Sequence, residues 1–302
     1  MRSVSDLNRE EQEVKTKKVL VTGATGKQGG AVARRLLERG HAVRALTRNP
    51  GSAAASSLRQ SGVELVTGSL DDGEALAGAL AGVDTVFAMT TPFEAGMEAE
   101  TRQGITVADA AKAAGVELVY TSVGSADRKT GIPHFESKYL VEQHIRKIGV
   151  PAAIIAPVYF MDNATAYTRD QLKAGVYATP LPPDLKLAQI AVADIASFAV
   201  VAIENPERFR GKRFDIAGDE VSGLDAVEIL SRVSGRKFSY FQVPMETVRE
   251  RMGEDTALMY EWFVRAGYQV DTAGLRREFP EVGWHTFEDW GRAQDWRGIF
   301  GA

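Results

Sequence analysis

The chain has no cysteine among its 302 residues, and this absence excludes several classes of protein. Without cysteine there is no disulfide framework, thiol nucleophile, zinc finger or iron–sulfur cluster. Histidine is also scarce, with only four in the chain. No two of His41, His134, His144 and His285 have the i, i+4 spacing of a helical metal site, so we expect no resident metal.

Long apolar runs and an excess of basic residues are missing as well. The two best runs, 152–161 and 191–203, are interrupted by Pro157 and Asp194, so we expect no membrane partner. The first 18 residues carry mixed charge and lack the apolar core of a signal peptide, which favours a cytoplasmic protein. The chain has 36 Lys and Arg residues against 40 Asp and Glu residues, a net charge of −4, which argues against a nucleic-acid partner.

Short apolar runs alternate with amphipathic helical patterns through the first half of the chain. Glycine follows each helical pattern, as is typical of a helix C-terminus. This alternation predicts an α/β fold with a doubly wound parallel sheet of the Rossmann type. An eight-fold barrel would need about 250 residues of the same repetition, and the pattern fades after residue 160. The expected strands are 18–22, 42–47, 63–66, 85–89, 116–121 and 152–156, and the expected helices are 29–39, 52–60, 72–80, 97–114 and 136–147.

The second half is less regular and predicts a smaller, mostly helical C-terminal domain. The expected elements there are helices over 159–173, 193–203, 222–233, 245–253, 255–266, 272–279 and 286–296, strands over 213–217 and 237–243, and a proline-rich loop over 179–186. The expected organisation is a mobile tail over 1–16, a larger α/β domain over 17–156 to which 187–217 returns, and a smaller domain over 157–186 and 218–302.

The sharpest motif is a glycine-rich turn between the first strand and the first helix, with Gly23, Gly26 and Gly29 three residues apart. The first glycine permits a tight turn, the second lets the backbone approach a diphosphate, and the third lets the helix pack against the strand. The unpaired N–H groups and the dipole at the helix start favour the anion. The motif therefore predicts dinucleotide binding, with a purely structural turn as the alternative.

The end of the second strand indicates which dinucleotide is bound. An acid there would hold a free ribose 2′-hydroxyl, whereas an arginine would hold a 2′-phosphate. The segment after 42–47 offers Arg48 and no acid. We therefore predict NADPH over NADH, because a guanidinium pairs well with a phosphate dianion. The alternative is a solvated surface arginine.

Ser122, His134 and Lys138 form a candidate catalytic group. Ser122 follows the strand 116–121, and His134 and Lys138 share one face of the next helix because they stand four residues apart. If Ser122 lies at the carboxyl end of its strand, all three side chains converge at the edge of the sheet where a nicotinamide would lie. A hydroxyl, an imidazole and an ammonium suit proton transfer beside a hydride donor. In the alternative interpretation, Lys138 only binds the ribose and His134 is an ordinary polar residue at a helix start.

Other side chains at the same edge are expected to contact cofactor or substrate. Thr90 and Phe93 follow the strand 85–89 and stand at the rim of the sheet. Tyr159 and Phe160 follow the strand 152–156, and we expect them to line a substrate pocket together with Phe93.

Together these segments resemble the NmrA-like proteins, an atypical branch of the short-chain dehydrogenase/reductase superfamily. Four motifs carry the resemblance over roughly residues 17–300: VTGATGKQGG at 21–30, TRNP at 47–50, HFESK at 134–138 and APVYFMDN at 156–163. The resemblance implies a Rossmann fold, a small C-terminal domain and a preference for NADP. By it, Gly23, Thr25, Gly26, Lys27, Gln28 and Gly29 hold the diphosphate, Arg48 the 2′-phosphate and Lys138 the nicotinamide ribose, Ser69 and Leu70 lie at the adenine, and Pro157, Val158 and Tyr159 line the nicotinamide pocket.

Two departures from the family pattern matter. The superfamily uses Ser followed by Tyr-x-x-x-Lys, and here His134 occupies the tyrosine position. Ser69 stands where relatives often have an aspartate that contacts the adenine, and Asp71 or Asp72 is the nearest substitute. Within the NmrA-like branch, members with such a tyrosine replacement include cofactor-sensing regulators, and others are reductases, quinone reductases among them.

These observations lead to two functional hypotheses. The first is an NADPH-dependent oxidoreductase that reduces a small apolar carbonyl, enone or quinone by hydride transfer. The second is a non-catalytic sensor of the NADPH/NADP+ state that regulates a protein partner, which requires different affinities for the two redox forms. The sequence favours the first hypothesis slightly and leaves both a monomer and a homodimer open.

Overall fold

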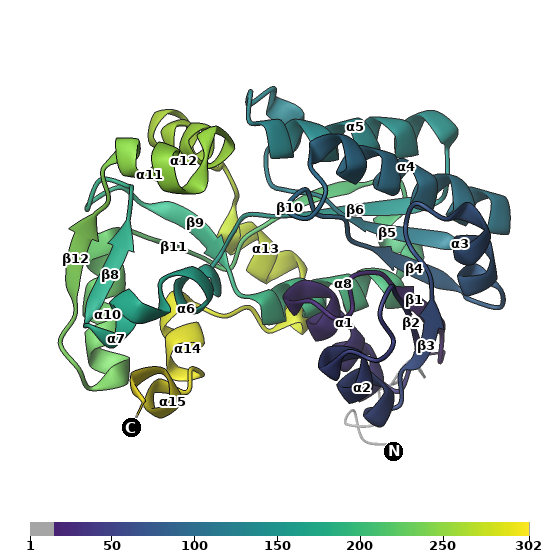
Figure 1. Cartoon of the computed structure of the whole chain (residues 1–302), viewed down its shortest axis with the longest axis horizontal. Coiled ribbons are helices and arrows are strands. Elements are labelled where there is room, and N and C mark those ends of the chain that lie inside the picture. Colours follow the sequence, from purple (N-terminus) through teal and green to yellow (C-terminus); the bar gives the residue numbers. More distant parts are fainter. Residues whose placement is uncertain (1–14, 302) are drawn as a thin grey trace, which may run out of the picture.

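A seven-stranded parallel sheet organises the chain, as the alternating pattern predicts. The computed structural model describes residues 15–301, so most of the tail expected over 1–16 lies outside the described residues. The strand order is β10-β6-β5-β4-β1-β2-β3, and every neighbouring pair is parallel (Figure 1). The strands are β1 (Lys18–Val21), β2 (Ala42–Thr47), β3 (Glu64–Thr67), β4 (Thr85–Ala88), β5 (Glu117–Thr121), β6 (Ala152–Pro157) and β10 (Arg213–Ile216).

Helices cover both faces of this sheet (Figure 1). Alternate strand residues point into two separate apolar layers, for example Val19 and Val21 into one and Leu20 into the other. The helices α1 (Lys27–Glu38) and α8 (Val192–Glu204) cover the first layer, and α3 (Gly73–Leu80), α4 (Met97–Ala114) and α5 (Pro133–Ile148) cover the second. Because both faces are covered, the strands in the middle of the sheet are largely apolar, which explains why the sequence pattern identified them. The short α2 (Ala53–Gln60) follows β2.

The glycines predicted at helix ends have that role. Gly115 and Gly149 are the C-caps of α4 and α5, each with φ of 66°, in the left-handed region where a side chain is strained. These caps let each helix stop and the chain turn directly into the next strand. The positions of α4 and α5 matter for function because both helices supply side chains to the candidate site.

The second half forms a smaller lobe that contains two further sheets. One is the three-stranded sheet β11 (Asp219–Val221), β9 (Leu187–Ile190) and β7 (Tyr159–Phe160), and the other pairs β12 (Ser239–Gln242) with β8 (Val176–Thr179). The remaining helices of the chain are α6 (Asn163–Tyr167), α7 (Arg169–Lys173), α9 (Pro206–Phe209), α10 (Gly223–Ser234), α11 (Met245–Met252), α12 (Glu254–Arg265), α13 (Thr272–Glu278), α14 (Phe287–Arg292) and α15 (Trp296–Phe300). Of these, α9 packs against α8 and β6 of the large sheet. Two 3₁₀ turns lie at Ala126–Arg128, between β5 and α5, and at Pro280–Val282.

The structure corrects the sequence prediction in this lobe. The helix expected over 159–173 begins with the strand β7, because Tyr159 and Phe160 pair with Gln189 and Ile190 of β9. The strands β8, β9 and β11 are short and were not predicted. The helix expected over 286–296 is split into α14 and α15, since the Asp295 side chain accepts a hydrogen bond from Gly298 N and starts a new helix.

The segment 187–217 contributes to both lobes. The helix α8 packs against α1, and β10 pairs with β6 at the edge of the large sheet. The strand β9 instead joins the small sheet with β7 and β11. Among residues 15–301, no helix is both long and apolar enough to cross a membrane.

Close packing of α4 on α5 makes Gly104 a test of this arrangement. A Cβ at Gly104 would lie 2.5 and 2.8 Å from the γ-methyl carbons of Val141. We expect Gly104→Ala to lower the free energy of unfolding by about 1–3 kcal/mol through overpacking. Denaturant unfolding measures this, with Gly78→Ala as the control, because that position in α3 has open space around it and should gain up to about 1 kcal/mol. Equal stabilisation of both variants would contradict the packing.

Candidate functional site

The glycine-rich turn has the shape that a diphosphate requires. Gly23 has φ of +63°, and a Cβ at Gly29 would collide with the backbone of Gly23 and Thr22. The N-cap of α1 is Gly26, which has no side chain to cap the helix, so the first N–H groups of α1 are left for an anion. Thr25 and Lys27 are exposed on the same turn. The turn therefore fits the diphosphate of a dinucleotide on its own geometry.

Two side chains of the turn point inward and fix it to the sheet. The buried Gln28 donates a hydrogen bond from Nε2 to Thr121 Oγ1 at the end of β5, at 2.7 Å. The hydroxyl of Thr22 bonds the backbone of Met89, as acceptor from its N–H at 2.7 Å and donor to its carbonyl at 2.9 Å. Gln28, predicted to hold the diphosphate, thus braces the turn. Lys27 stays outside, with Nζ 5.7 Å from the ring centre of Tyr167 on α6.

Arg48 lies at the same edge of the sheet and is paired with an acid. Its Nη2 is 2.6 Å from Oε2 of Glu94, in the loop after β4, and both side chains are more than half exposed. An exposed pair of this kind contributes little stability and opens readily. A 2′-phosphate bound to Arg48 would therefore have to displace Glu94.

The residues expected at the adenine make local contacts. Ser69 Oγ accepts a hydrogen bond from Asp71 N at 3.2 Å, and Leu70 packs against the apolar layer beneath α3 and α4. Asp71 accepts hydrogen bonds from Gln103 and Arg102, which hold its pKa below the ordinary value. Asp72 caps α3. Neither acid is free to replace the aspartate that relatives carry at Ser69.

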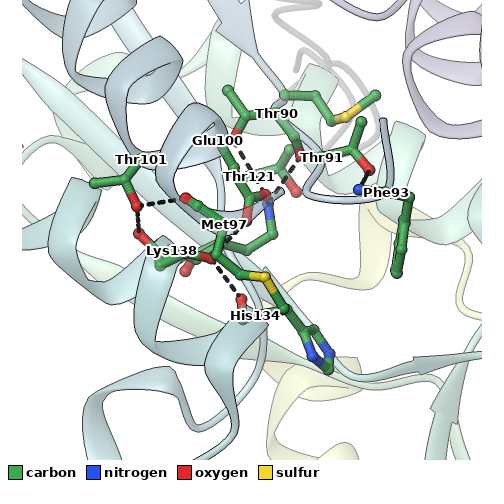
Figure 2. Close-up of polar contacts among 12 residues, drawn as sticks. Thr90, Thr91, Phe93, Met97, Glu100, Thr101, Thr121, His134 and Lys138 are labelled. Carbon is green, nitrogen blue, oxygen red and sulfur yellow. Dashed lines mark hydrogen bonds and ion pairs between the residues drawn. The ribbon is translucent and has the colours of Figure 1, made fainter. Parts of the chain in front are cut away.

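Lys138 sits on a buried carboxylate. Its Nζ is 2.8 Å from Oε1 of Glu100 and donates to the carbonyl of Thr90 at 3.0 Å (Figure 2). Glu100, on α4, is fully buried, and its Oε2 accepts a hydrogen bond from Ser137 Oγ at 2.5 Å. The Thr90 hydroxyl lies 3.4 Å from the same carboxylate. Lys138 is therefore held rigidly at the edge of the sheet, where its charge is compensated by Glu100.

His134 points to the other side, toward a different acid. Figure 2 shows its ring extending away from Lys138, on the side where Phe93 lies. The ring Nδ1 is 2.6 Å from Oδ2 of Asp255, and the backbone N–H of His134 donates to Oδ1 of Asp255 at 3.1 Å. The His134 side chain is 14% exposed, and its ring centre lies 6.5 Å from that of Phe93. His134 is thus anchored on one nitrogen and stays accessible beside an exposed aromatic ring.

Ser122 does not join these two residues. Its hydroxyl hydrogen-bonds Oε1 of Glu142 at 2.5 Å, and Glu142 is fully buried on α5. Arg213 and Arg146 also bond to Glu142, with N–O distances of 3.0 and 2.8 Å. Ser122 therefore belongs to a buried polar network beneath the edge of the sheet, and the predicted convergence of all three side chains is absent from the structure.

The segment after β6 faces the small lobe. Pro157 and Val158 are buried, and Phe160 packs against the apolar layer of α1 and α8. The Tyr159 hydroxyl lies 3.0 Å from that of Tyr260, and burial raises the pKa of both phenols. These tyrosines line a cavity of about 10 Å³, roughly the space of one water. A substrate cannot enter there without movement. His134 and Phe93 do not line this cavity.

Sequence reasoning missed the carboxylates that hold the predicted residues. Glu100, Glu142 and Asp255 pair with Lys138, Ser122 and His134 respectively. Glu142 follows Lys138 by four residues on the same helix face, but this spacing would predict a pair with Lys138 and not the observed contact with Ser122. Asp255 is 121 residues from His134, and no spacing rule connects the two.

Comparisons with known proteins agree with this geometry. The model of the NmrA-like family matches residues 15–290. The (4-alkanoyl-5-oxo-2,5-dihydrofuran-3-yl)methyl phosphate reductase of Streptomyces griseus is 34% identical over 250 residues, 81% of each chain. The NAD(P)H azoreductase of Xenophilus azovorans is 30% identical over 241 residues, 78% of this chain and 80% of that one. The structure of NmrA, a negative transcriptional regulator, in complex with NADP has a TM-score of 0.76 at 22% identity and covers 93% of this chain and 99% of that one, which shows a shared fold.

The Glu100–Lys138 pair makes a stability prediction. We expect Glu100→Gln to lower the free energy of unfolding by about 3 kcal/mol, because removing one partner of a buried pair leaves the other charge uncompensated. Urea unfolding measures the change. Adding Lys138→Met to Glu100→Gln should restore part of the loss, and Glu98→Gln, at an exposed position of α4, should change stability by less than about 0.5 kcal/mol. A Glu100→Gln protein as stable as the wild type would show that the pair is not desolvated.

Proposed function

The chain belongs to the NmrA-like family, and from that membership and the site geometry we propose that it is an NADPH-dependent oxidoreductase that reduces a small apolar carbonyl, enone or quinone. Two relatives that cover about four-fifths of the chain are named as a reductase and an NAD(P)H azoreductase. The observation that carries the proposal is the position of His134, an accessible imidazole at the same edge of the sheet as the dinucleotide turn.

NADP(H) is the cofactor that this edge accommodates. The backbone at Gly23, Gly26 and Gly29 would hold the diphosphate, and Arg48 would hold the 2′-phosphate once Glu94 is displaced. Lys138 would bind the nicotinamide ribose, since its ammonium is already fixed by Glu100 and Thr90. When bound, NADPH supplies a hydride.

The side chains of the protein would position the acceptor and donate a proton to it. His134 is placed to give a proton to the oxygen of the acceptor as charge develops there. Phe93, which is 79% exposed, offers an apolar surface beside the imidazole for a flat acceptor. Lys138 contributes positive potential from its fixed position. Ser122 is engaged by Glu142 and takes no part in the proposed step.

A second candidate is the redox sensor that regulates a protein partner. It is supported by the small size of the cavity at Tyr159, and by the likeness in fold to the transcriptional regulator NmrA. In the sensor candidate the same turn and Arg48 bind the dinucleotide, and the small lobe communicates the redox state of the dinucleotide to the protein partner. The two candidates differ in whether an acceptor is reduced.

The cofactor proposal predicts opposite effects at the two members of the exposed ion pair. Arg48→Glu should weaken NADPH binding roughly 10- to 100-fold, because a charged hydrogen bond to the 2′-phosphate is lost. Glu94→Gln should strengthen NADPH binding up to about fivefold, since the competing carboxylate is removed. NADH affinity should change much less in Glu94→Gln. Calorimetric titration of both cofactors checks this, and equal wild-type affinities for NADPH and NADH would refute the assignment of Arg48.

The oxidoreductase proposal predicts NADPH oxidation with members of a panel of quinones, enones and carbonyls. Because His134 supplies the proton, the pH dependence of kcat should differ between the wild type and His134→Gln. Loss of the donor should lower kcat by about 10²- to 10⁴-fold. Stopped-flow and steady-state absorbance of NADPH measure both effects. Tight NADPH binding without turnover on any acceptor would favour the sensor.

A further inference from the structure

We propose that Asp255 is the positioning residue for His134: its carboxylate holds the Nδ1 side of the imidazole, so that Nε2 is the nitrogen presented to the substrate. This inference deepens the proposed function and rests on it. It concerns a residue of the small lobe that acts on a residue of the nucleotide-binding lobe.

One carboxylate holds His134 at two points. Oδ1 of Asp255 accepts the backbone N–H of His134 at 3.1 Å, and Oδ2 lies 2.6 Å from the ring Nδ1. The second contact has the distance of a charge-assisted bond, but Nδ1 does not meet the angle of a regular hydrogen bond. Catalytic contacts commonly reach their final geometry only when ligand is bound.

The backbone contact also caps a helix from another lobe. His134 lies in the first turn of α5, whose N-cap is Ile132, a residue with no side-chain acceptor. Asp255 supplies that acceptor from the first turn of α12. Its carboxylate therefore lies near the positive ends of two helices, which favours the anion. Although burial opposes its charge, the contacts with His134 hold the pKa of Asp255 below its ordinary value.

Packing keeps the pair in place. Phe135, next to His134, meets the ring of His134 edge-on with ring centres 4.8 Å apart, and meets Trp262 of α12 at 6.0 Å. Trp262 is buried, so α12 is fixed against the start of α5. The charged groups that bear on the imidazole are Asp255 from α12 and Lys138 four residues along α5, the latter already paired with Glu100.

The Nε2 nitrogen of His134 is the free one. Among residues 15–301 it has no hydrogen-bond partner, and the ring centre of the exposed Phe93 lies 6.5 Å from that of His134. In the proposed step bound NADPH would supply the hydride to one atom of the acceptor, and the oxygen of the acceptor would take the proton from Nε2. The imidazolium becomes neutral imidazole, keeps its Nδ1 proton beside Asp255, and regains the Nε2 proton from solvent. Asp255 stays ionised throughout.

The test combines a spectroscopic and a kinetic measurement on the full chain. The ¹⁵N chemical shifts of His134 report which ring nitrogen carries the proton in the neutral form. We expect the Nδ1–H tautomer in wild type and its loss in Asp255→Asn, because the amide can donate to Nδ1. With an acceptor that turns over, Asp255→Asn should lower kcat roughly 10- to 100-fold, as is typical for a residue that orients a catalytic group, with NADPH affinity unchanged.

Controls separate positioning from a structural role. Glu254→Gln alters the neighbouring carboxylate of α12, which pairs with Arg249 at the surface, and should leave the tautomer and kcat as in wild type. The double variant His134→Gln with Asp255→Asn should be no slower than His134→Gln alone, because the two residues act as a unit.

An unchanged tautomer in Asp255→Asn, or kinetic effects that simply add in the double variant, would overturn the proposal and leave Asp255 as a helix cap. If wild type turns over no acceptor, the oxidoreductase function fails, and the ¹⁵N measurement alone still decides whether Asp255 orients His134.

Discussion

Charge pairing in a desolvated environment governs the polar edge of the large sheet. Glu100 and Glu142 are fully buried, and such carboxylates persist only when cations and hydrogen-bond donors compensate them. Lys138 forms an ion pair with Glu100. Arg213 and Arg146 form ion pairs with Glu142. The partners come from separate elements, so the ends of the strands and the helices above them must keep one relative position. That rigidity is what a hydride-transfer site requires of its scaffold.

The dinucleotide turn depends on a complementary constraint, the exclusion of side chains. At Gly29 the helix α1 approaches the backbone of the turn so closely that any Cβ would collide. The N-cap Gly26 also has no side chain, so the first N–H groups of α1 have no side-chain cap and are available to an anion. In the proposed function, the backbone dipoles of the turn would bind the cofactor, and buried ion pairs would orient the side chains at the edge of the sheet. The small lobe contributes one of these ion pairs, because its Asp255 contacts His134.

Much of the large sheet could be predicted because its strands are buried on both faces. The strands in the middle of the sheet are then largely apolar runs, and glycines mark where helices end, as Gly115 and Gly149 show. The small lobe was harder to predict from the sequence. Tyr159 and Phe160 carry no local signal that distinguishes strand from helix, and their conformation is decided by pairing with Gln189 and Ile190, about thirty residues away along the chain. Short strands paired over such distances follow tertiary context more than propensity.

The sequence by itself determined the parallel sheet and the glycine turn, because period and spacing are properties of neighbouring residues. It also placed His134 and Lys138 on one helix and Arg48 after the second strand, at the edge where all three are found. Only the tertiary structure decided which group each side chain faces: Asp255 for His134, Glu100 for Lys138, Glu142 for Ser122 and Glu94 for Arg48. The reason is physical. A side chain's direction follows from the charges that packing brings within a few ångströms, and those charges are contributed by segments distant in the chain.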